Sequence, residues 1–440
     1  MDKLDRFFFA SSLFSVLILP FFLTHFRGVA DFFISNVAMI FVVHAIFNKD
    51  WQWVKQFWVI IAFIWWSWLV LCTIPVKTYL FTREGGNVFE AIAVIRFIFF
   101  VAALQYWVLN EKIFRDWLRV IIILCALYIV TQLLFQFIFG FNFFGSPRYI
   151  DGTLTGPYTR PRAAAPLSRI FLPITLYICS YLFVYAKGGL KQVCAFFILL
   201  FAIVILALAG QRMPFLLFIL GLIVSSIWIR PLRILALTLI ILIPFVLMII
   251  AFISPGSFHH LVVRFIEQMS HFTMSAYGLV YVRALVMGIM NPWLGLGYDA
   301  FKHACTESIY FHGLFYLKLT NFDGGGLAVC LTHPHNHYLQ ALVDSGVPGL
   351  SLFILLIFSW LKKLAQGLED SIVYIDHPWD RFWRVGLFAA VFIHEWPLAS
   401  TSNFTNMPLG GWFFLILGLG LSYSQDYQAC SAMDGKISKS

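Results

Sequence analysis

Residues 234–253 read ILALTLIILIPFVLMIIAFI, an apolar run that contains no charged side chain. A transmembrane helix needs about 20 consecutive apolar residues to cross the ~30 Å hydrocarbon core of a bilayer. The same criterion identifies further segments on both sides of this run, and the full set is 7–25, 29–47, 56–76, 88–109, 117–140, 167–186, 190–209, 213–229, 234–253, 338–360, 382–397 and 404–423. We therefore predict an all-α polytopic membrane protein with about 12 transmembrane helices.

The composition supports this class. The chain has 440 residues, of which 61% are hydrophobic and only 12% are charged, and a soluble fold cannot bury so much apolar surface. The formal net charge of +9 does not by itself indicate nucleic-acid binding, because in a membrane protein the location of the charges matters more than their sum. We expect no nucleic-acid partner, and membrane lipids around the helices.

The basic residues predict the orientation of these spans. If the spans alternate, one side of the membrane collects Lys3, Arg6, Lys49, Lys55, Lys112, Arg115, Arg119, Lys187, Lys191, Arg230, Arg233, Lys362, Lys363, Arg381, Arg384, Lys436 and Lys439. The positive-inside rule makes that side cytoplasmic, together with both termini. The first apolar run is long and lacks a small-residue cleavage site, so we expect it to remain as an anchor.

The predicted spans divide the chain into four parts. Residues 1–253 hold the first nine spans, 254–337 form a large outward loop, 338–424 hold the last three spans, and 425–440 form a cytoplasmic tail. Within the loop, 258–274 and 276–290 show helical apolar spacing, and Pro292 ends the second segment. A loop of this length with helices of its own usually has a function.

The loop ends in the stretch 332–339, THPHNHYL, which carries three histidines. Pro334 suits the first turn of the helix that follows, with Thr332 or His333 as its N-cap. Free N–H groups and the helix dipole at such a position favour an anion and disfavour a second proton on imidazole. We therefore interpret His335 as a catalytic base, supported by Asn336 and by the two flanking histidines, His333 and His337.

Two other interpretations of these histidines remain open. They can simply be polar capping residues at the membrane interface. A metal site is the second alternative, because His333 and His337 are four residues apart. No carboxylate lies near them in the sequence to complete a zinc site, so we predict no metal and no cofactor.

Arginines on the predicted outer side are the second signal. Arg162 lies in the segment 141–166, Arg212 lies in a tight turn before Pro214, and Arg283 lies in the loop helix. Guanidinium groups match phosphate oxygens in pairs, so these arginines predict a site for a lipid-linked phosphate or diphosphate. Arg212 could instead extend to the interface, and Arg283 could lie on a solvated face.

Several other polar residues are interpreted as structural. Arg148 and Arg160 are expected to be loop charges, and Arg96 to pair with Glu90 or another buried acid. Asp344 lies near glycines that permit close helix packing, so we expect a structural role for it. His394 and Glu395 could orient another side chain of the site or anchor the interface.

Cys305 and Cys330 are the two cysteines that we place on the outer side. A disulfide is chemically available in an oxidising compartment, and this one would close a loop of roughly 25 residues. We predict that the bridge forms and restrains the approach to the histidine helix.

Together these residues resemble a known family, the bacterial O-antigen ligases and the related O-antigen polymerases. His335 begins the pattern His-Asn-x-Tyr-Leu-x-x-Leu-x-Asp-x-Gly-x-x-Gly-Leu, in which Gly346 follows after ten residues and which ends at Leu350. Arg212 is followed by three residues and Leu216 after a short outer turn, and Arg283 precedes NPWLGLG at 291–297. The acid of the histidine helix is Asp344 here, where glutamate is common in the family.

The resemblance implies a glycosyltransferase of the bacterial inner membrane with a periplasmic active site and an architecture like that of integral-membrane (GT-C-like) glycosyltransferases. It implies transfer of O-antigen polysaccharide from undecaprenyl diphosphate to a sugar hydroxyl of lipid A–core in lipopolysaccharide biosynthesis. The reaction would be inverting and metal-independent, with His335 as general base and Arg212, Arg283 and Arg162 binding the diphosphate.

Two alternative functions remain open at this stage. An O-antigen polymerase would use similar residues and pass the chain to another lipid-linked repeat. A membrane transporter of a lipid-linked or anionic substrate is the alternative that is not an enzyme, and it predicts an internal repeat with polar groups at mid-membrane. We find no such repeat in the sequence.

Overall fold

The computed structural model describes residues 3–77, 82–83, 86–185, 189–314, 317–318, 326–369, 378–399 and 402–437. Every predicted span coincides with a helix, and these are α1 (Lys3–His25), α2 (Arg27–Asn48), α3 (Phe57–Thr73), α4, α5 and η2 in succession (Val88–Ala93, Ile95–Ala103 and Leu104–Val108), α6 (Lys112–Phe139), α7 (Ala164–Tyr185), α8 (Leu190–Leu208), α9 (Arg212–Ser225), α10 (Arg230–Ile253), α15 (His337–Ala365), α16 (Pro378–His394) and α17 (Leu409–Ile437).

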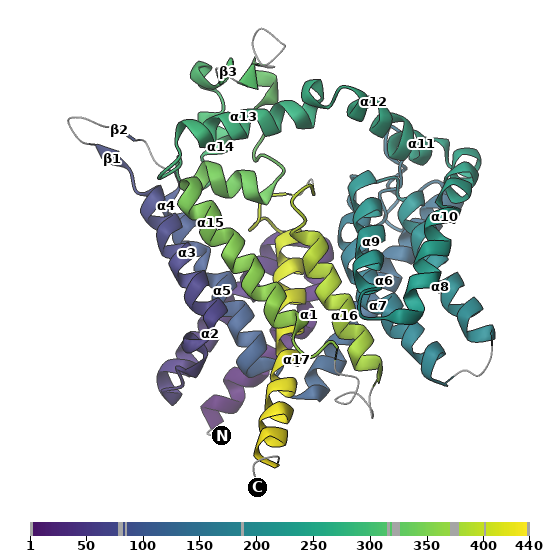
Figure 1. Ribbon diagram of the computed structural model, residues 1–440, viewed down its shortest axis with the longest axis horizontal. Helices are drawn as coiled ribbons and strands as arrows, with labels where there is room; N and C mark the ends of the chain where they lie inside the picture. The colour runs from purple at the N-terminus through teal and green to yellow at the C-terminus, as the bar shows by residue number, and fades with distance from the viewer. Residues whose placement is uncertain are drawn as a thin grey trace.

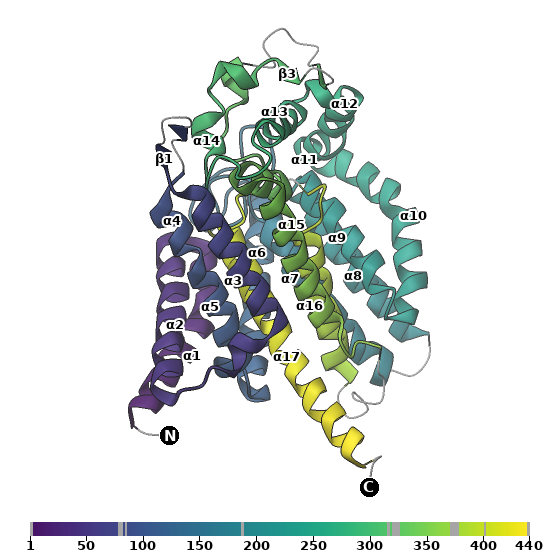
Figure 2. The ribbon, with the colours of Figure 1, turned by 60° about the vertical axis from the view of Figure 1, so that its left-hand side comes forward.

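The polytopic all-α class is confirmed. Among the described residues, eight helices are long and apolar enough to cross a membrane, by length and composition alone. Shorter apolar helices include α3, α9 and the first part of α17. Helix α17 continues to Ile437, so the segment that we expected to be a tail is helical there. Figure 2 shows this part of α17 extending past the other helices.

The loop 254–337 contains most of the remaining structure. It holds α11 (Pro255–Phe258), η3 (His259–Val263), α12 (Arg264–Ser270), η4 (Phe272–Met274), α13 (Ala276–Met290), α14 (Phe301–Ala304), η5 (Ser308–Tyr310) and η6 (Gly326–Val329). Two small antiparallel hairpins complete the described elements, β1 (Val76–Lys77) with β2 (Thr82–Arg83), and β3 (Gly313–Leu314) with β4 (Leu317–Lys318).

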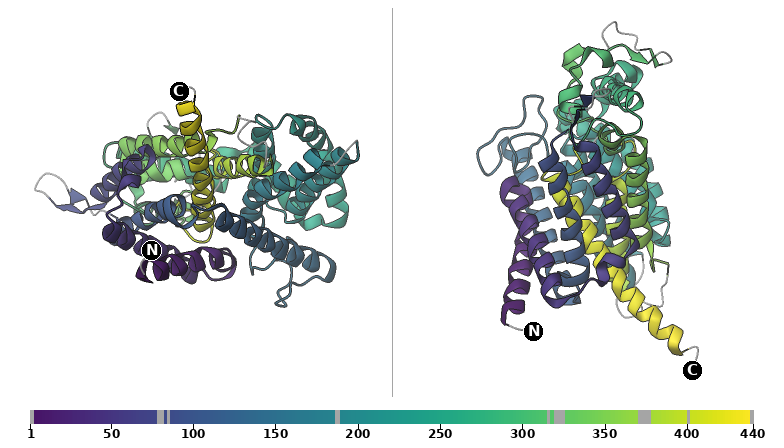
Figure 3. Two further views of the ribbon diagram at one scale, coloured as in Figure 1. Left: turned by 90° about the horizontal axis from the view of Figure 1, so that it is seen from below. Right: turned by 90° about the vertical axis from the view of Figure 1, so that its left-hand side faces the viewer.

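The helical segments predicted in this loop are confirmed, and α13 spans the residues expected for the second of them. Ser275 caps α13, and its side chain accepts a hydrogen bond from the N–H of Gly278. Elements α11 to α13, which we call the arch, cross one end of the bundle from α10 towards α15 (Figure 1). We call this end of the bundle the loop end. Both termini lie at the opposite end (Figure 3, right).

The helices pack around a continuous apolar core. Helix α16 packs on α7, α9 and α17, while α15 packs on α3 and α1 on α2. The buried side chains include Phe97, Phe353, Trp360 and Phe413. Many large apolar side chains face outwards instead, as expected for helices surrounded by lipid tails rather than water.

Helix α15 is interrupted at Gly346, which has φ 66° and ψ −169°. The residues that follow cannot complete the helical hydrogen bonds, because Pro348 has no N–H to donate. The loop after α13 supplies replacement donors. Leu296 N–H donates to the Val343 carbonyl at 2.7 Å, and Gly297 N–H donates to the backbone carbonyl of Asp344 at 2.9 Å. In return, Val347 N–H donates to the Pro292 carbonyl at 2.7 Å.

The indole of Trp68 in α3 completes this arrangement by donating to the Ser345 carbonyl at 3.0 Å. Buried backbone groups must be paired, so the break depends on the 292–297 loop and on α3 together. Asp344 lies in the same place, buried, and receives a hydrogen bond from the Gln340 amide at 3.4 Å. Its structural interpretation agrees with this packing.

We expect Gly346→Ala to destabilise the protein strongly. The conformation at this position is accessible essentially only to glycine, and an added Cβ would lie 2.6 Å from the Pro292 and Trp293 carbonyl oxygens. The conformational term alone costs on the order of 1–3 kcal/mol. The melting temperature of purified protein should fall well below that of Gly189→Ala, whose Cβ meets no atom within 4 Å. Equal melting temperatures for the two variants would contradict this account of the break.

Candidate functional site

His333 and His335 lie before the start of α15 rather than in its first turn. Helix α15 begins at His337, and its N-cap is Asn336, whose side-chain oxygen accepts from the N–H groups of Tyr338 and Leu339 at 3.0 Å. The predicted start at Pro334 is therefore wrong by three residues. His335 has φ 53°, a left-handed conformation that cannot continue a helix and is uncommon outside glycine.

Asn336 and the next two residues hold the loop that joins α16 to α17. The Asn336 amide donates to the Pro397 carbonyl at 2.6 Å, and the Tyr338 hydroxyl donates to the Glu395 carbonyl at 2.6 Å. His337 Nε2 lies 3.0 Å from the Ser402 carbonyl. The start of α15 therefore fixes the positions of Glu395, Pro397 and Ser402.

His335 lines a cavity of about 690 Å³ at the loop end. Its ring packs against Tyr277 and His333, with centroid distances of 5.5 Å and 4.3 Å. The same cavity is lined by Arg27, Arg160 and Arg162, and by no aspartate or glutamate of the described chain. We call it the arginine cavity. Its charge suits an anion such as a phosphate group.

A second cavity of about 560 Å³ adjoins the first. We call it the mixed-charge cavity, because both basic and acidic residues line it. Its charged lining residues are Arg27, Asp31, Glu90, Arg96, Asp299 and Lys302. Arg96 is paired with Asp31 at 3.1 Å, rather than with Glu90. Asp299 has φ 58°, a second left-handed residue at the wall of a cavity.

His333 lies between the two cavities and lines both. Its Nδ1 is hydrogen-bonded to the Thr332 hydroxyl at 2.8 Å, and its Nε2 is buried without a hydrogen-bond partner among the described residues. Burial, followed by the neighbouring His335 and His337, lowers the pKa of His333 to about 4. The imidazole is therefore neutral at neutral pH and can accept a proton from a bound group.

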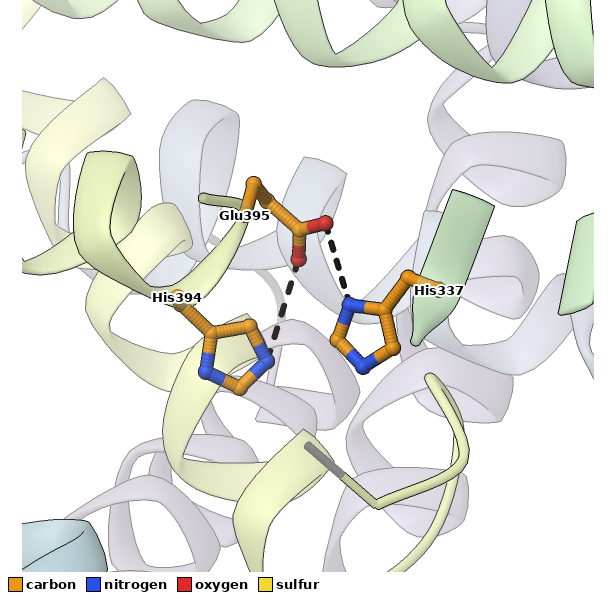
Figure 4. A group of neighbouring side chains, drawn as sticks. All are labelled: His337, His394 and Glu395. Atoms are coloured by element: carbon orange, nitrogen blue, oxygen red, sulfur yellow. Dashed lines mark hydrogen bonds and ion pairs between the residues drawn. The ribbon is translucent and has the colours of Figure 1, made fainter. Parts of the chain in front are cut away.

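His337 lies behind the arginine cavity in a buried polar cluster with Glu395 and His394 (Figure 4). His337 Nδ1 is 3.1 Å from one Glu395 oxygen, and His394 Nε2 is 3.8 Å from the other. The Arg169 Nε–H donates to His394 Nδ1 at 2.7 Å. Of the two interpretations of His394 and Glu395, the structure supports the one in which they orient another side chain, here His337.

The hydrogen bonds assign protons in this cluster. The Ser402 carbonyl can only accept, so His337 Nε2 carries a hydrogen, and a second hydrogen is shared between His337 Nδ1 and the Glu395 carboxyl group. His394 Nδ1 accepts from Arg169, so the His394 ring carries its hydrogen on Nε2. His337, His394 and Glu395 could also serve as metal ligands, since one potential ligand atom from each lies within 4.8 Å of the others. The adjacent Arg169 cation and the existing hydrogen bonds favour a hydrogen-bonded cluster instead.

Arg283 lies outside both cavities. It is fully buried within the loop 254–337, where its guanidinium donates to the Cys305 carbonyl at 2.8 Å and to the Gly326 carbonyl at 3.3 Å. It also stacks on Phe311, with 4.2 Å from Cζ to the ring centroid. Arg283 therefore does not lie on a solvated face. It also does not line either cavity, so it cannot contact a ligand bound there directly.

The predicted disulfide between Cys305 and Cys330 is confirmed, with 5.5 Å between the two Cα atoms. Arg283 Nη1 lies 3.9 Å from both sulfur atoms. The bridge and the arginine together connect α13 to the segment that leads to His333. The bridge therefore restrains the chain just before the histidine stretch, as expected.

Arg212 opens α9 and contacts the arch above it. Its Nη1 donates to the Gln268 side-chain oxygen at 2.6 Å and to the Arg264 carbonyl at 3.1 Å, both in α12. Arg212 is not among the residues that line the arginine cavity, although the preceding residue, Gln211, is. The structure thus brings together His335, His333 and Arg162, with Arg212 at the margin and Arg283 apart.

Sequence reasoning missed two arginines of this cavity. Arg160 was interpreted as a loop charge, and Arg27 was not considered. Arg27 is the first residue of α2, separated from α1 by Phe26 alone. It lies on the predicted outer side, where the positive-inside rule disfavours arginine, and that signal could have identified it. Arg148, by contrast, donates to the Phe137 carbonyl at 2.6 Å, consistent with the expected structural role.

Comparison with known proteins agrees with the resemblance seen in the sequence. A family model described as O-antigen ligase matches residues 196–354, which include α9, the arch, the histidine stretch and the break in α15. A Rickettsia typhi protein named "Putative polysaccharide ligase" is 30% identical over 76 residues, which cover 17% of this chain and 17% of that protein. Residues 196–354 are thus similar to the O-antigen ligase family.

We expect Arg283→Lys to lower the melting temperature, because an ammonium group cannot bond both carbonyls as the planar guanidinium does. A buried acceptor left without its partner costs about 1–3 kcal/mol. Arg162→Lys, at an exposed position, should leave the melting temperature unchanged. An unchanged melting temperature in Arg283→Lys, with weaker substrate binding, would instead place Arg283 in direct contact with a ligand.

His333 should make the protein less stable in mild acid. The unfolded chain binds a proton near pH 6.5 and the folded chain only near pH 4, so stability is lost as the pH falls through this window. His333→Asn removes that contribution. Its melting temperature should therefore fall less than that of the wild type between pH 7 and pH 5. The exposed His303→Asn serves as the control and should follow the wild type.

Proposed function

We propose that this protein is a glycosyltransferase that joins a polysaccharide carried on undecaprenyl diphosphate to a sugar hydroxyl of lipid A–core. The proposal rests on the similarity of residues 196–354 to the O-antigen ligase family and on one feature of the site. That feature is the arginine cavity, which gathers Arg27, Arg160 and Arg162 beside His335 without an acidic residue. A diphosphate leaving group needs such an environment.

The reaction would be a single displacement. The acceptor hydroxyl oxygen forms a bond to the anomeric carbon of the donor while the bond from that carbon to the phosphate oxygen breaks, which inverts the anomeric centre. The hydroxyl proton passes to a neutral imidazole, which we assign to His335. The electron pair of the broken bond leaves on the diphosphate, whose developing charge Arg162 and its neighbours stabilise.

The other predicted arginines take indirect roles in this proposal. Arg212 joins α9 to the arch at the edge of the arginine cavity, where it can reach a long diphosphate ligand or fix the arch in place. Arg283 supports the loop that carries the histidines instead of binding the ligand. Asn336 and His337 hold Pro397 and Ser402 in place through hydrogen bonds.

The proposed location is the bacterial inner membrane, with the loop end in the periplasm. The disulfide at the loop end supports this orientation, because such bonds persist in oxidising compartments. Both substrates are anchored in lipid, so a site at the end of the helical bundle, near the predicted membrane surface, allows both to reach it.

The test is a reconstituted assay with the purified full chain, lipid-linked O-antigen and lipid A–core, run with a metal chelator present. We expect the wild type to join the two, and His335→Ala to be slower by about a hundredfold or more, as typical for loss of a general base. His303→Ala is the matched control, an exposed histidine of the same loop.

The products distinguish the alternatives. Longer chains on the lipid carrier without lipid A–core would indicate a polymerase. No joining of any kind, by protein that inserts and folds normally, would contradict the proposed glycosyltransferase. Normal transfer by His335→Ala would move the base to His333, which faces the same cavity.

A further inference from the structure

The two adjoining cavities differ in the balance of their charges. Among the described residues, the arginine cavity is lined by three arginines and no acid. The mixed-charge cavity is lined by three basic residues, Arg27, Arg96 and Lys302, and three acidic residues, Asp31, Glu90 and Asp299. The first suits an anion. The second suits a ligand that is neutral overall and has many polar groups.

We infer that the mixed-charge cavity binds the acceptor, as a saccharide whose hydroxyl groups donate to its carboxylates. This inference rests on the proposed function, and it assigns the two cavities to two different substrates. The volume of about 560 Å³ falls within the ~300–1,000 Å³ that is usual for small-molecule sites.

The polar groups of this cavity are already held in place. The Asp299 carboxylate lies 3.3 Å from Lys302 Nζ and accepts from the Asn403 amide at 3.4 Å. The side-chain oxygen of Asn403 accepts in turn from the N–H and hydroxyl of Thr405, at 3.1 Å and 3.2 Å. Hydrogen bonds from hydroxyls to ionised carboxylates are stronger than those between neutral groups, so such a network can hold a sugar in one orientation.

The left-handed conformation of Asp299 is a second observation that points to a ligand. Three residues other than glycine have positive φ in the described chain, Lys49, Asp299 and His335. Lys49 has an ordinary reason for it, since it is the C-cap of α2. The other two each line one of the cavities, and unusual backbone conformations cluster at functional sites.

The place where the cavities meet suits a transfer reaction. They share four lining residues, Arg27, His333, Asn406 and Met407. A hydroxyl bound in the mixed-charge cavity can reach an anomeric carbon bound in the arginine cavity only at this junction. The buried Nε2 of His333 lies at the junction without a hydrogen-bond partner among the described residues.

The experiment measures KM for each substrate separately in the reconstituted assay. Asp299→Asn and Glu90→Gln remove a carboxylate while keeping its size, and asparagine tolerates the left-handed conformation at 299. Each should raise KM for lipid A–core about tenfold and leave KM for the lipid-linked donor within about twofold. Arg162→Lys should show the reverse pattern, because it alters the arginine cavity.

Glu307→Gln is the matched control, an exposed acid of the same loop that lines neither cavity, and both of its KM values should equal those of the wild type. Direct binding of delipidated core oligosaccharide to the purified protein, without donor, provides a second readout, and the same two variants should weaken it. Unchanged acceptor KM and unchanged binding in both variants would overturn the inference. A wild type that joins no saccharide contradicts the proposed function instead, and the binding readout then decides whether the cavity holds a saccharide.

Discussion

The interrupted helix α15 is the constraint on which the site depends. A helix broken inside an apolar bundle leaves buried carbonyl and N–H groups that must find other partners. Here the 292–297 loop and Trp68 satisfy them, so the end of α13 and helix α3 both pack against the break at Gly346. The segment before the break is thereby held by the arch, and the histidines at its start lie at the cavity instead of extending along the bundle.

The start of α15 organises the opposite wall in the same way. Asn336, His337 and Tyr338 each bond to the chain between α16 and α17, which supplies lining residues to both cavities. Behind them, Arg169, His394 and Glu395 form a chain of hydrogen bonds and charge contacts that ends at His337. Breaking such a buried network leaves an uncompensated charge, so each member constrains the others.

Apolar length predicted a helical segment at each of the twelve places, and eight of the described helices are long and apolar enough to cross a membrane. The long loop between the ninth and tenth spans could also be predicted, and with it the disulfide and the position of His335 at the loop end. The direction of individual side chains could not. Arg283 lies on an amphipathic helix in the sequence, but the disulfide-closed segment covers its face and buries it.

The start of α15 illustrates a second limit of sequence reasoning. Pro334 is a good first residue of a helix, and Asn336 is a good cap, and both rules apply within three residues. The cap at Asn336 prevails because His335 adopts a left-handed conformation and the Asn336 amide also bonds to Pro397. That second contact comes from a segment about sixty residues away, which no local pattern contains.

The separation of charge between the cavities has a consequence for the ionic conditions under which the protein works. A cavity that holds three arginines without an acid projects a positive potential towards an approaching anion, and dissolved salt screens such a potential over about 8 Å at physiological ionic strength. The mixed-charge cavity projects little net field, because its acids and bases cancel. Under the proposed assignment of the two cavities, capture of the donor in the first would weaken as ionic strength rises, while recognition of the acceptor in the second, which depends on short-range hydrogen bonds, would change little.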